Sequence, residues 1–173
     1  MIDMLTLVAD ALPVRQPARR LPPGYAVRAP VRDDIEALGR LYHSAYEPGI
    51  ASETVEEAID DVQATFDGGY GRLWTAASGV VVHSGEPVAA LLVVHRTPWP
   101  DVPDCPFVVE LFTARGHRRL GLARALVAGC LALVATTDRP LLALRVDEGN
   151  EPARRLYGSL GFTRWRSSAE NGA

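Results

Sequence analysis

A short basic stretch, Arg118 to Arg124, contains residue types that suit phosphate binding. An apolar segment, residues 107–113, precedes it, and apolar residues at a spacing of three to four follow from Leu122, so the sequence predicts a strand, a basic turn and a helix. The first amides of a helix lack partners inside it, and the peptide dipoles make that end positive, so an anion binds well there. Gly121 would let the backbone approach that anion closely, and the arginines would add forked donors. Taken alone, the pattern also fits an ordinary helix start.

A second stretch, residues 150–162, reads NEPARRLYGSLGF and follows the first after one predicted strand. The two motifs, RxxGxA and then NxxAxxLYxxLGF, together resemble the GNAT superfamily of acyl-CoA-dependent N-acetyltransferases. The resemblance is strongest over residues 107–164 and extends from Tyr25 onward. It implies an enzyme that moves an acetyl group from acetyl-CoA to a primary amine by direct attack.

The resemblance also implies an α/β (α+β) GNAT fold, in which helices cover both faces of a mixed, mostly antiparallel twisted sheet of six to seven strands. The sheet would be splayed between the strands at 107–113 and 141–146. A single domain, residues 25–173, would hold this fold, and a chain of 173 residues is long enough for it. Residues 1–24 end in a Pro-Pro-Gly boundary and are interpreted as an N-terminal arm.

Capping residues and apolar periodicity predict where several elements begin. Helices are expected to start at Asp33 and at Thr54, because each is followed three residues later by a glutamate in the capping-box pattern. Asn150 is expected to cap the last helix. A strand is expected over residues 74–83, before a nearly all-apolar central strand over residues 88–94.

The closing edge of the sheet departs from the family pattern. The family usually ends with a hairpin of two strands, whereas only seven polar residues follow Arg166. The seventh strand would therefore be missing, or supplied by residues 1–12, or supplied by another copy of the chain in a homodimer. Because proteins rarely leave a long apolar edge open, we predict that residues 1–9 are ordered against the domain or against a second copy.

The resemblance assigns a cofactor site. Three strand residues would pair through their backbone with the pantetheine arm of acetyl-CoA, and the basic turn would bind its pyrophosphate. These residues are Leu111, Phe112 and Thr113 for the arm, and Arg118, Arg119, Leu120, Gly121, Leu122, Ala123 and Arg124 for the pyrophosphate. Asn150 matches a family position that contacts the arm, although it equally fits a helix cap.

Two residues are candidates for proton transfer. Tyr157 matches the family tyrosine near the thioester sulfur, and a phenol can protonate a departing thiolate of similar basicity. Glu110 is the candidate base, because a carboxylate in an apolar strand tends to have a raised pKa. Both residues also fit roles in packing or ion pairing. Other candidates for the base are His83, His95 and Asp104, or a relayed water.

Composition limits the remaining choices. The net charge of −3 argues against general attraction to nucleic acid, and no segment approaches the roughly 20 apolar residues of a membrane span. No metal-ligand spacing stands out, and we expect a cytoplasmic protein. Residues 33–67 contain ten acids and one arginine. A negatively charged surface formed by these residues would attract a cationic acceptor amine. The alternative to an enzyme is a non-catalytic acyl-CoA-binding sensor or protein-interaction module.

Overall fold

A seven-stranded sheet in the order β2-β3-β4-β5-β6-β1-β7 forms the centre of the molecule. The computed structural model describes residues 3–12, 20–47, 50 and 52–166. The strands are β1 (Met4–Asp10), β2 (Tyr25–Arg28), β3 (Gly79–His83), β4 (Glu86–Val94), β5 (Phe107–Thr113), β6 (Leu141–Asp147) and β7 (Thr163–Arg164). The helices are α1 (Ile35–Ala45), α2 (Val55–Phe66), α3 (Leu122–Val134) and α4 (Glu151–Ser159).

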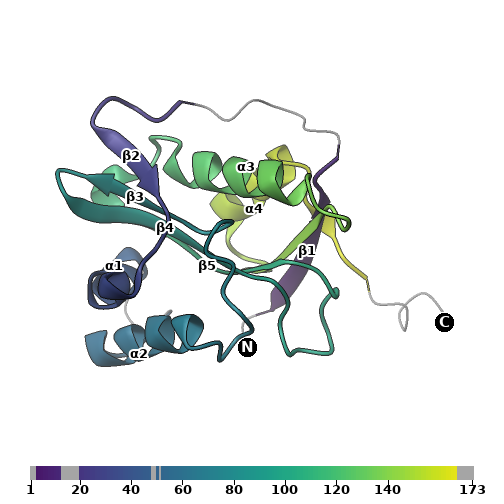
Figure 1. Ribbon diagram of the computed structural model, residues 1–173, viewed down its shortest axis with the longest axis horizontal. Helices are drawn as coiled ribbons and strands as arrows, with labels where there is room; N and C mark the ends of the chain where they lie inside the picture. Colours follow the sequence, from purple (N-terminus) through teal and green to yellow (C-terminus); the bar gives the residue numbers. More distant parts are fainter. Residues whose placement is uncertain (1–2, 13–19, 48–49, 51, 167–173) are drawn as a thin grey trace.

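Helices cover both faces of this sheet (Figure 1). One core lies between the sheet and the helices α3 and α4, and it includes Leu122, Leu126 and Tyr157. A second core lies between the sheet and the helices α1 and α2, and it includes Leu38 and Val62. The central strand β4 is buried from Val88 to Val94 because both cores contact it. Among the described residues, none of the helices has the length and apolar character needed to cross a membrane.

The strand pairings confirm a mixed, mostly antiparallel sheet. Every neighbouring pair is antiparallel except β5 and β6, which are parallel and pair Phe107 with Ala143 and Val108 with Leu144. The predicted splay of the sheet between these two strands stays a prediction. On the other side of β5, the register with β4 shifts so that Val108 pairs with Val93 and Glu110 with Leu92.

The N-terminal segment supplies the strand that the sequence left open. All seven residues of β1 pair with β6, from Met4 opposite Asp147 to Asp10 opposite Leu141. β7 pairs with the opposite side of β1. Inward-facing Leu5, Leu7 and Ala9 are buried, as expected for side chains that alternate along a strand. Of the three predicted outcomes, the structure therefore shows that residues of the same chain provide the strand.

Two predicted element starts were wrong. The strand expected over residues 74–83 begins only at Gly79, because the amides of Ala77 and Ser78 both bond to the carbonyl of Trp74 in a turn. The helix expected at Asp33 begins at Ile35, after a short 3₁₀ turn over Arg32–Asp34.

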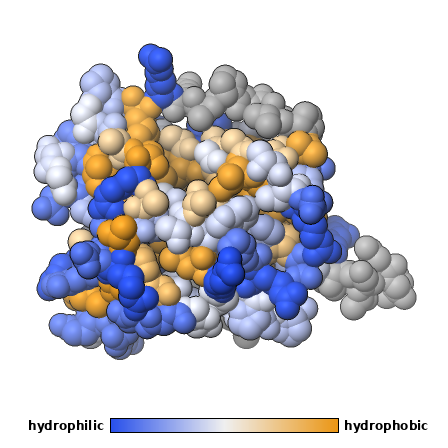
Figure 2. All heavy atoms as spheres, in the orientation of Figure 1, coloured by the Kyte–Doolittle hydropathy of each residue, from blue (hydrophilic) through white to orange (hydrophobic). Residues whose placement is uncertain are grey.

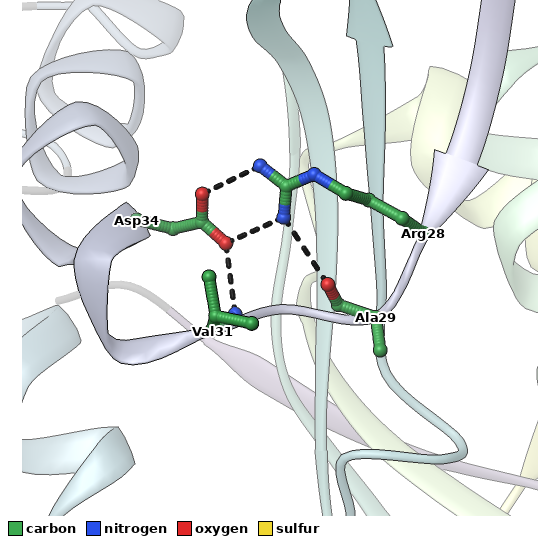
Figure 3. Close-up of polar contacts among 4 residues, drawn as sticks. All are labelled: Arg28, Ala29, Val31 and Asp34. Carbon is green, nitrogen blue, oxygen red and sulfur yellow. Dashed lines mark hydrogen bonds and ion pairs between the residues drawn. The ribbon is translucent and has the colours of Figure 1, made fainter.

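Asp34, rather than its neighbour Asp33, makes the contacts that organise this turn. Its carboxylate accepts hydrogen bonds from both terminal nitrogens of Arg28, at 2.7 and 2.6 Å, and from the amide of Val31 at 2.8 Å (Figure 3). The Arg28 guanidinium also donates to the carbonyl of Ala29. These bonds attach the start of α1 to the end of β2.

Candidate active site

A pocket of about 570 Å³ lies where the end of β5, the start of α3 and the helix α4 meet. Most of the predicted site residues line it: Leu111, Phe112, Thr113, Arg118, Arg119, Gly121, Leu122, Ala123, Arg124, Asn150 and Tyr157. Leu120 and Glu110 lie outside this lining. The lining also contains residues that were not predicted as site residues, namely Ala45, Tyr46, His117 and Pro152, together with Ala153 and Leu156 of the second motif. The structure thus brings together two motifs that are about 30 residues apart in the sequence.

The start of α3 has the backbone geometry of an anion site. Gly121 immediately precedes the helix and has a φ of 79°, and Arg119 has a φ of 63°. Both values lie in the left-handed region, which disfavours side chains at position 121. A Cβ at Gly121 would have no neighbour within 4 Å, so this side of the backbone is open. The first residues of α3, whose amides have no partner inside the helix, also line the pocket.

The four arginines from Arg115, in the short 3₁₀ turn over Arg115–His117, to Arg124 divide into two groups. Arg118 donates to the carbonyls of Ala45 and Thr113, and Arg115 donates to the carbonyls of Ser44 and Tyr46. Cations favour the C-terminal end of a helix, where carbonyls are unpaired. These two arginines therefore hold the end of α1 against β5 and the turn that follows it, a role that the sequence did not indicate.

The other two arginines of the turn keep donors available to the pocket. Arg119 makes no hydrogen bond or ion pair with any residue that the structure describes. Arg124 donates to the hydroxyl of Ser159 on α4. A guanidinium has five N–H donors, so one such bond leaves Arg124 free to make others. The charge that remains for a phosphate is thus mainly that of Arg119 and Arg124.

Tyr157 is positioned by the capped helix α4. The side chain of Asn150 accepts a hydrogen bond from the amide of Ala153, as predicted for a cap. Tyr157 is 7% exposed, lies against Phe162 and lines the pocket. Burial, with a smaller contribution from Glu110, raises the pKa of Tyr157 to about 12. The hydroxyl is therefore protonated at neutral pH, and it is a weaker acid than the phenol of ordinary pKa that the sequence argument assumed.

Glu110 lies on the side of β5 that faces α1 and α2. It is two residues before Phe112, which packs on Tyr42 of α1, and side chains two apart share a face. Burial, and then the charge of Asp61, raise the pKa of Glu110 to about 8, while the Tyr42 hydroxyl lowers it. The expectation of a raised pKa for a carboxylate in this apolar strand is confirmed. Such a group can accept a proton near neutral pH.

Tyr46 interacts electrostatically with both Glu110 and Tyr157. Its hydroxyl donates to the carbonyl of Leu111 at 3.2 Å, and its ring lines the pocket. Burial raises its pKa, and both Glu110 and Tyr157 raise it further. Tyr46 follows Tyr42 by four residues, so the apolar stripe of α1 could have indicated that it faces β5. A carbonyl has two lone pairs, so Leu111 can still accept a second hydrogen bond.

The other candidate bases lie elsewhere. Within the described part of the chain, the pocket lining includes none of His83, His95 and Asp104. His83 bonds to the carbonyl of Gly24, and His95 stacks on Trp74 with its pKa lowered by burial. Asp104 forms ion pairs with arginines outside the pocket. The described residues also contain no group of three or more His, Cys, Asp or Glu side chains placed to hold a metal ion.

The protein family of this chain follows from a comparison with known families. The model of the acetyltransferase (GNAT) family matches residues 35–162, which include the helices α1 to α4 and the strands β3 to β6. The chain belongs to the GNAT acetyltransferase family. The RxxGxA turn at the start of α3 and the tyrosine-bearing α4 both lie inside the matched region of this GNAT protein.

Individual relatives agree with this assignment. A mycothiol acetyltransferase from Thermobispora bispora is 50% identical over 49 residues, which cover 28% of this chain and 17% of that protein. A GCN5-related N-acetyltransferase from Sphaerobacter thermophilus has a TM-score of 0.68 at 21% identity, and the match covers 94% of this chain and 48% of that one. The GNAT chain therefore spans about half the length of the Sphaerobacter protein.

A third relative was solved with a ligand. AAC(6')-Iy, in complex with the bisubstrate analog CoA-S-monomethyl-acetylneamine, has a TM-score of 0.61 at 16% identity. The match covers 83% of this GNAT chain and 93% of that one. At this identity, the likeness shows a shared fold.

Proposed function

We propose that this protein transfers an acetyl group from acetyl-CoA to a primary amine by direct attack. The observation that carries the proposal is that the β5 backbone, the open start of α3 and the Tyr157 hydroxyl line the same pocket. An acyl-CoA has a pyrophosphate, an amide-bearing arm and a thioester in that order. The lining offers, in a matching order, an anion site, an extended backbone and a proton donor.

The donor would be held mainly by backbone groups. Residues Leu111 to Thr113 would pair with the amides of the pantetheine arm, and the amides of residues 119–123 would bind the pyrophosphate. Arg119 and Arg124 would add charge, while Arg118 would fix the wall of the pocket through the carbonyl of Ala45. The CoA-containing ligand named for AAC(6')-Iy supports this placement by analogy of fold.

The proton steps would use the two groups with raised pKa values. Glu110 would accept a proton from the acceptor ammonium, directly or through a water, and the freed amine nitrogen would attack the thioester carbonyl carbon. As the new C–N bond forms, the C–S bond breaks, and Tyr157 would give its proton to the departing thiolate. The nitrogen would then release its second proton, which would return the Tyr157 phenolate to the neutral phenol and leave the amide. Glu110 works best near its pKa of about 8 because a base must be ionised yet still basic.

The acceptor would approach from the side of α1 and α2. Hydrophilic side chains gather over these two helices on the face shown in Figure 2, and the segment from residue 33 to 67 has ten acids and one arginine. A surface of this sign raises the local concentration of a cationic amine. We therefore propose that the acceptor is a protonated primary amine.

One observation favours a second candidate, a non-catalytic acyl-CoA sensor. Glu110 does not line the pocket, and a base that is held away from the thioester would leave a cleft that binds the donor without turnover.

A screen of primary amines distinguishes the two candidates. Free thiol released from acetyl-CoA is measured with each amine, and acetyl-CoA affinity is measured by calorimetry. Amine-dependent thiol release that is greatly reduced in Tyr157→Phe supports the enzyme. Binding of acetyl-CoA without release by any amine supports the sensor, and the absence of both binding and release contradicts the two together.

A further inference from the structure

Three aromatic rings pack together next to the basic turn. Tyr25 begins β2 and lies directly opposite His83 of β3, so the two side chains share one face of the sheet. Their rings stack with centroids 4.3 Å apart and planes 19° from parallel. The ring of His117, which ends the short turn before Arg118, lies 5.7 Å from that of Tyr25 and 5.4 Å from that of His83. His117 also lines the pocket, so the cluster reaches the proposed donor site.

Hydrogen bonds fix the orientation of these rings. The hydroxyl oxygen of Tyr25 lies 2.8 Å from Nδ1 of His117. Nδ1 of His83 lies 3.0 Å from the carbonyl oxygen of Gly24, and this nitrogen must donate because a carbonyl only accepts. His83 is thereby held against the residue that precedes β2, with its ring on that of Tyr25. Tyr25 in turn orients the imidazole of His117.

The bond to Tyr25 determines what the second ring nitrogen of His117 can do. A neutral imidazole nitrogen is a stronger acceptor than a phenol oxygen, so the hydroxyl donates to Nδ1 and the ring hydrogen lies on Nε2. In the charged imidazolium both nitrogens carry a hydrogen. Nε2 is therefore a donor in either state, and it makes no hydrogen bond with any residue that the structure describes. Because the two nitrogens diverge across the ring, Nε2–H points away from Tyr25.

The pocket has a use for such a donor. Arg118, the next residue, is already bonded to two backbone carbonyls, which leaves mainly Arg119 and Arg124 for an anion. An N–H group close to the unpaired amides of α3 adds a directed bond to the same anion. Of the groups in an acyl-CoA, only the phosphates are anionic, and their oxygens accept hydrogen bonds.

We propose that Nε2–H of His117, with its hydrogen held on that nitrogen by Tyr25, donates a hydrogen bond to the pyrophosphate of the acyl donor. The inference rests on the proposed function, in which the start of α3 binds this pyrophosphate. His117 is then a binding residue for the donor, and Tyr25 is a positioning residue that acts through His117.

Calorimetry with acetyl-CoA tests the contact. We expect His117→Ala to weaken binding about tenfold, as for the loss of a hydrogen bond to a charged group. His117→Gln places its amide nitrogen near the position of Nε2 and should restore most of the affinity. His117→Asn places its amide nitrogen near Nδ1 and should not. Equal affinities of wild type and His117→Ala, or equal losses in the Gln and Asn variants, would overturn the inference.

A control variant and a second donor molecule locate the effect. His95→Ala removes another half-buried histidine, one outside the pocket lining, and should leave the affinity for acetyl-CoA unchanged. Acetyl-dephospho-CoA lacks the separate phosphate on the ribose but keeps the pyrophosphate. His117→Ala should weaken its binding by the same factor as that of acetyl-CoA. No loss with this second donor would assign His117 to the ribose phosphate and contradict its placement at the pyrophosphate.

Nitrogen NMR of the imidazole rings tests the role of Tyr25 without a ligand. His117→Gln assigns the His117 signals, and long-range proton–nitrogen correlations show which nitrogen carries the hydrogen in the neutral ring. We expect the hydrogen on Nε2 in the wild type, and a measurable share on Nδ1 in Tyr25→Phe. A hydrogen on Nδ1 in the wild type, or identical spectra in the two proteins, overturns the role of Tyr25. A wild type with the hydrogen on Nε2 that does not bind acetyl-CoA instead contradicts the proposed function.

Discussion

Replacing Asp34 by alanine is expected to destabilise the fold markedly. The carboxylate, 8% exposed, makes two charge-assisted bonds to Arg28 and one to the amide of Val31. These bonds connect β2 to the start of α1, and α1 carries Tyr42 and Tyr46 to the acceptor side. The change thus removes the attachment of the helix that forms one wall of the site.

The expected loss of stability depends on which groups lose a hydrogen-bond partner in the variant. A hydrogen bond to a charged group contributes roughly 1.5–3 kcal/mol. The side chain of Arg28 is 42% exposed, so its guanidinium can bind water after the change, and the sum must be discounted. The amide of Val31 would lose its partner. We expect Asp34→Ala to lower the free energy of unfolding by about 2–3 kcal/mol, or the Tm by about 5–10 °C for a chain of this size.

Urea denaturation at pH 7 measures this change, and Asp33→Ala is the control. Asp33 is exposed and forms no hydrogen bond or ion pair with the residues that the structure describes, so its replacement should change the free energy by less than about 0.5 kcal/mol. A similarly small change in Asp34→Ala would refute the reasoning, as would an equal loss in both variants.

The effect of Asp34 should also depend on pH. The bond from Arg28, and then that from Val31, lower the pKa of Asp34 in the folded state. A lowered folded pKa gives stability that is complete above the unfolded value of about 3.9 and is lost as the pH falls through the folded value. The difference in stability between wild type and Asp34→Ala should be constant between pH 5 and pH 7 and should shrink below about pH 4.

Three further predictions concern the pocket and the sheet. Tyr157→Phe should lower kcat about a hundredfold, as for a lost general acid, with little change in the Kd for acetyl-CoA; equal turnover would assign Tyr157 to packing. Gly121→Val should weaken acetyl-CoA binding at least about tenfold, because a branched residue opposes the left-handed backbone at the start of α3. Calorimetry measures the affinity, and Gly129→Val, on the exposed side of the same helix, is the control. Equal affinities of Gly121→Val and Gly129→Val for acetyl-CoA would contradict this placement. Deleting residues 1–12 should lower the Tm and cause aggregation, because β6 loses its seven-residue pairing with β1; an unchanged Tm and mass in solution would show that the strand is dispensable.

Local signals in the sequence predicted many of the residues that line the pocket. The RxxGxA turn and the helix that bears Tyr157 were predicted from residues a few positions apart. The cap at Thr54, which accepts a hydrogen bond from the amide of Glu57, and the cap at Asn150 were predicted in the same way. These features depend on contacts within one turn of helix, so the order of residues contains the information. The raised pKa of Glu110 was also predictable, because the apolar residues around a carboxylate in such a strand disfavour its charged form.

Features that join distant segments were decided by the tertiary structure. Asp33 and Asp34 are adjacent acids with the same local pattern, and only the position of Arg28 selects Asp34. Arg118 and Arg119 likewise differ little in the sequence, yet only Arg118 reaches the end of α1. The pairing of β1 with β6 joins residues more than 130 positions apart, and the sequence left it open whether the same chain or another supplies that strand. A side chain's partner depends on the direction in which folding turns it, and that direction is fixed by packing across the sheet rather than by its neighbours in the chain.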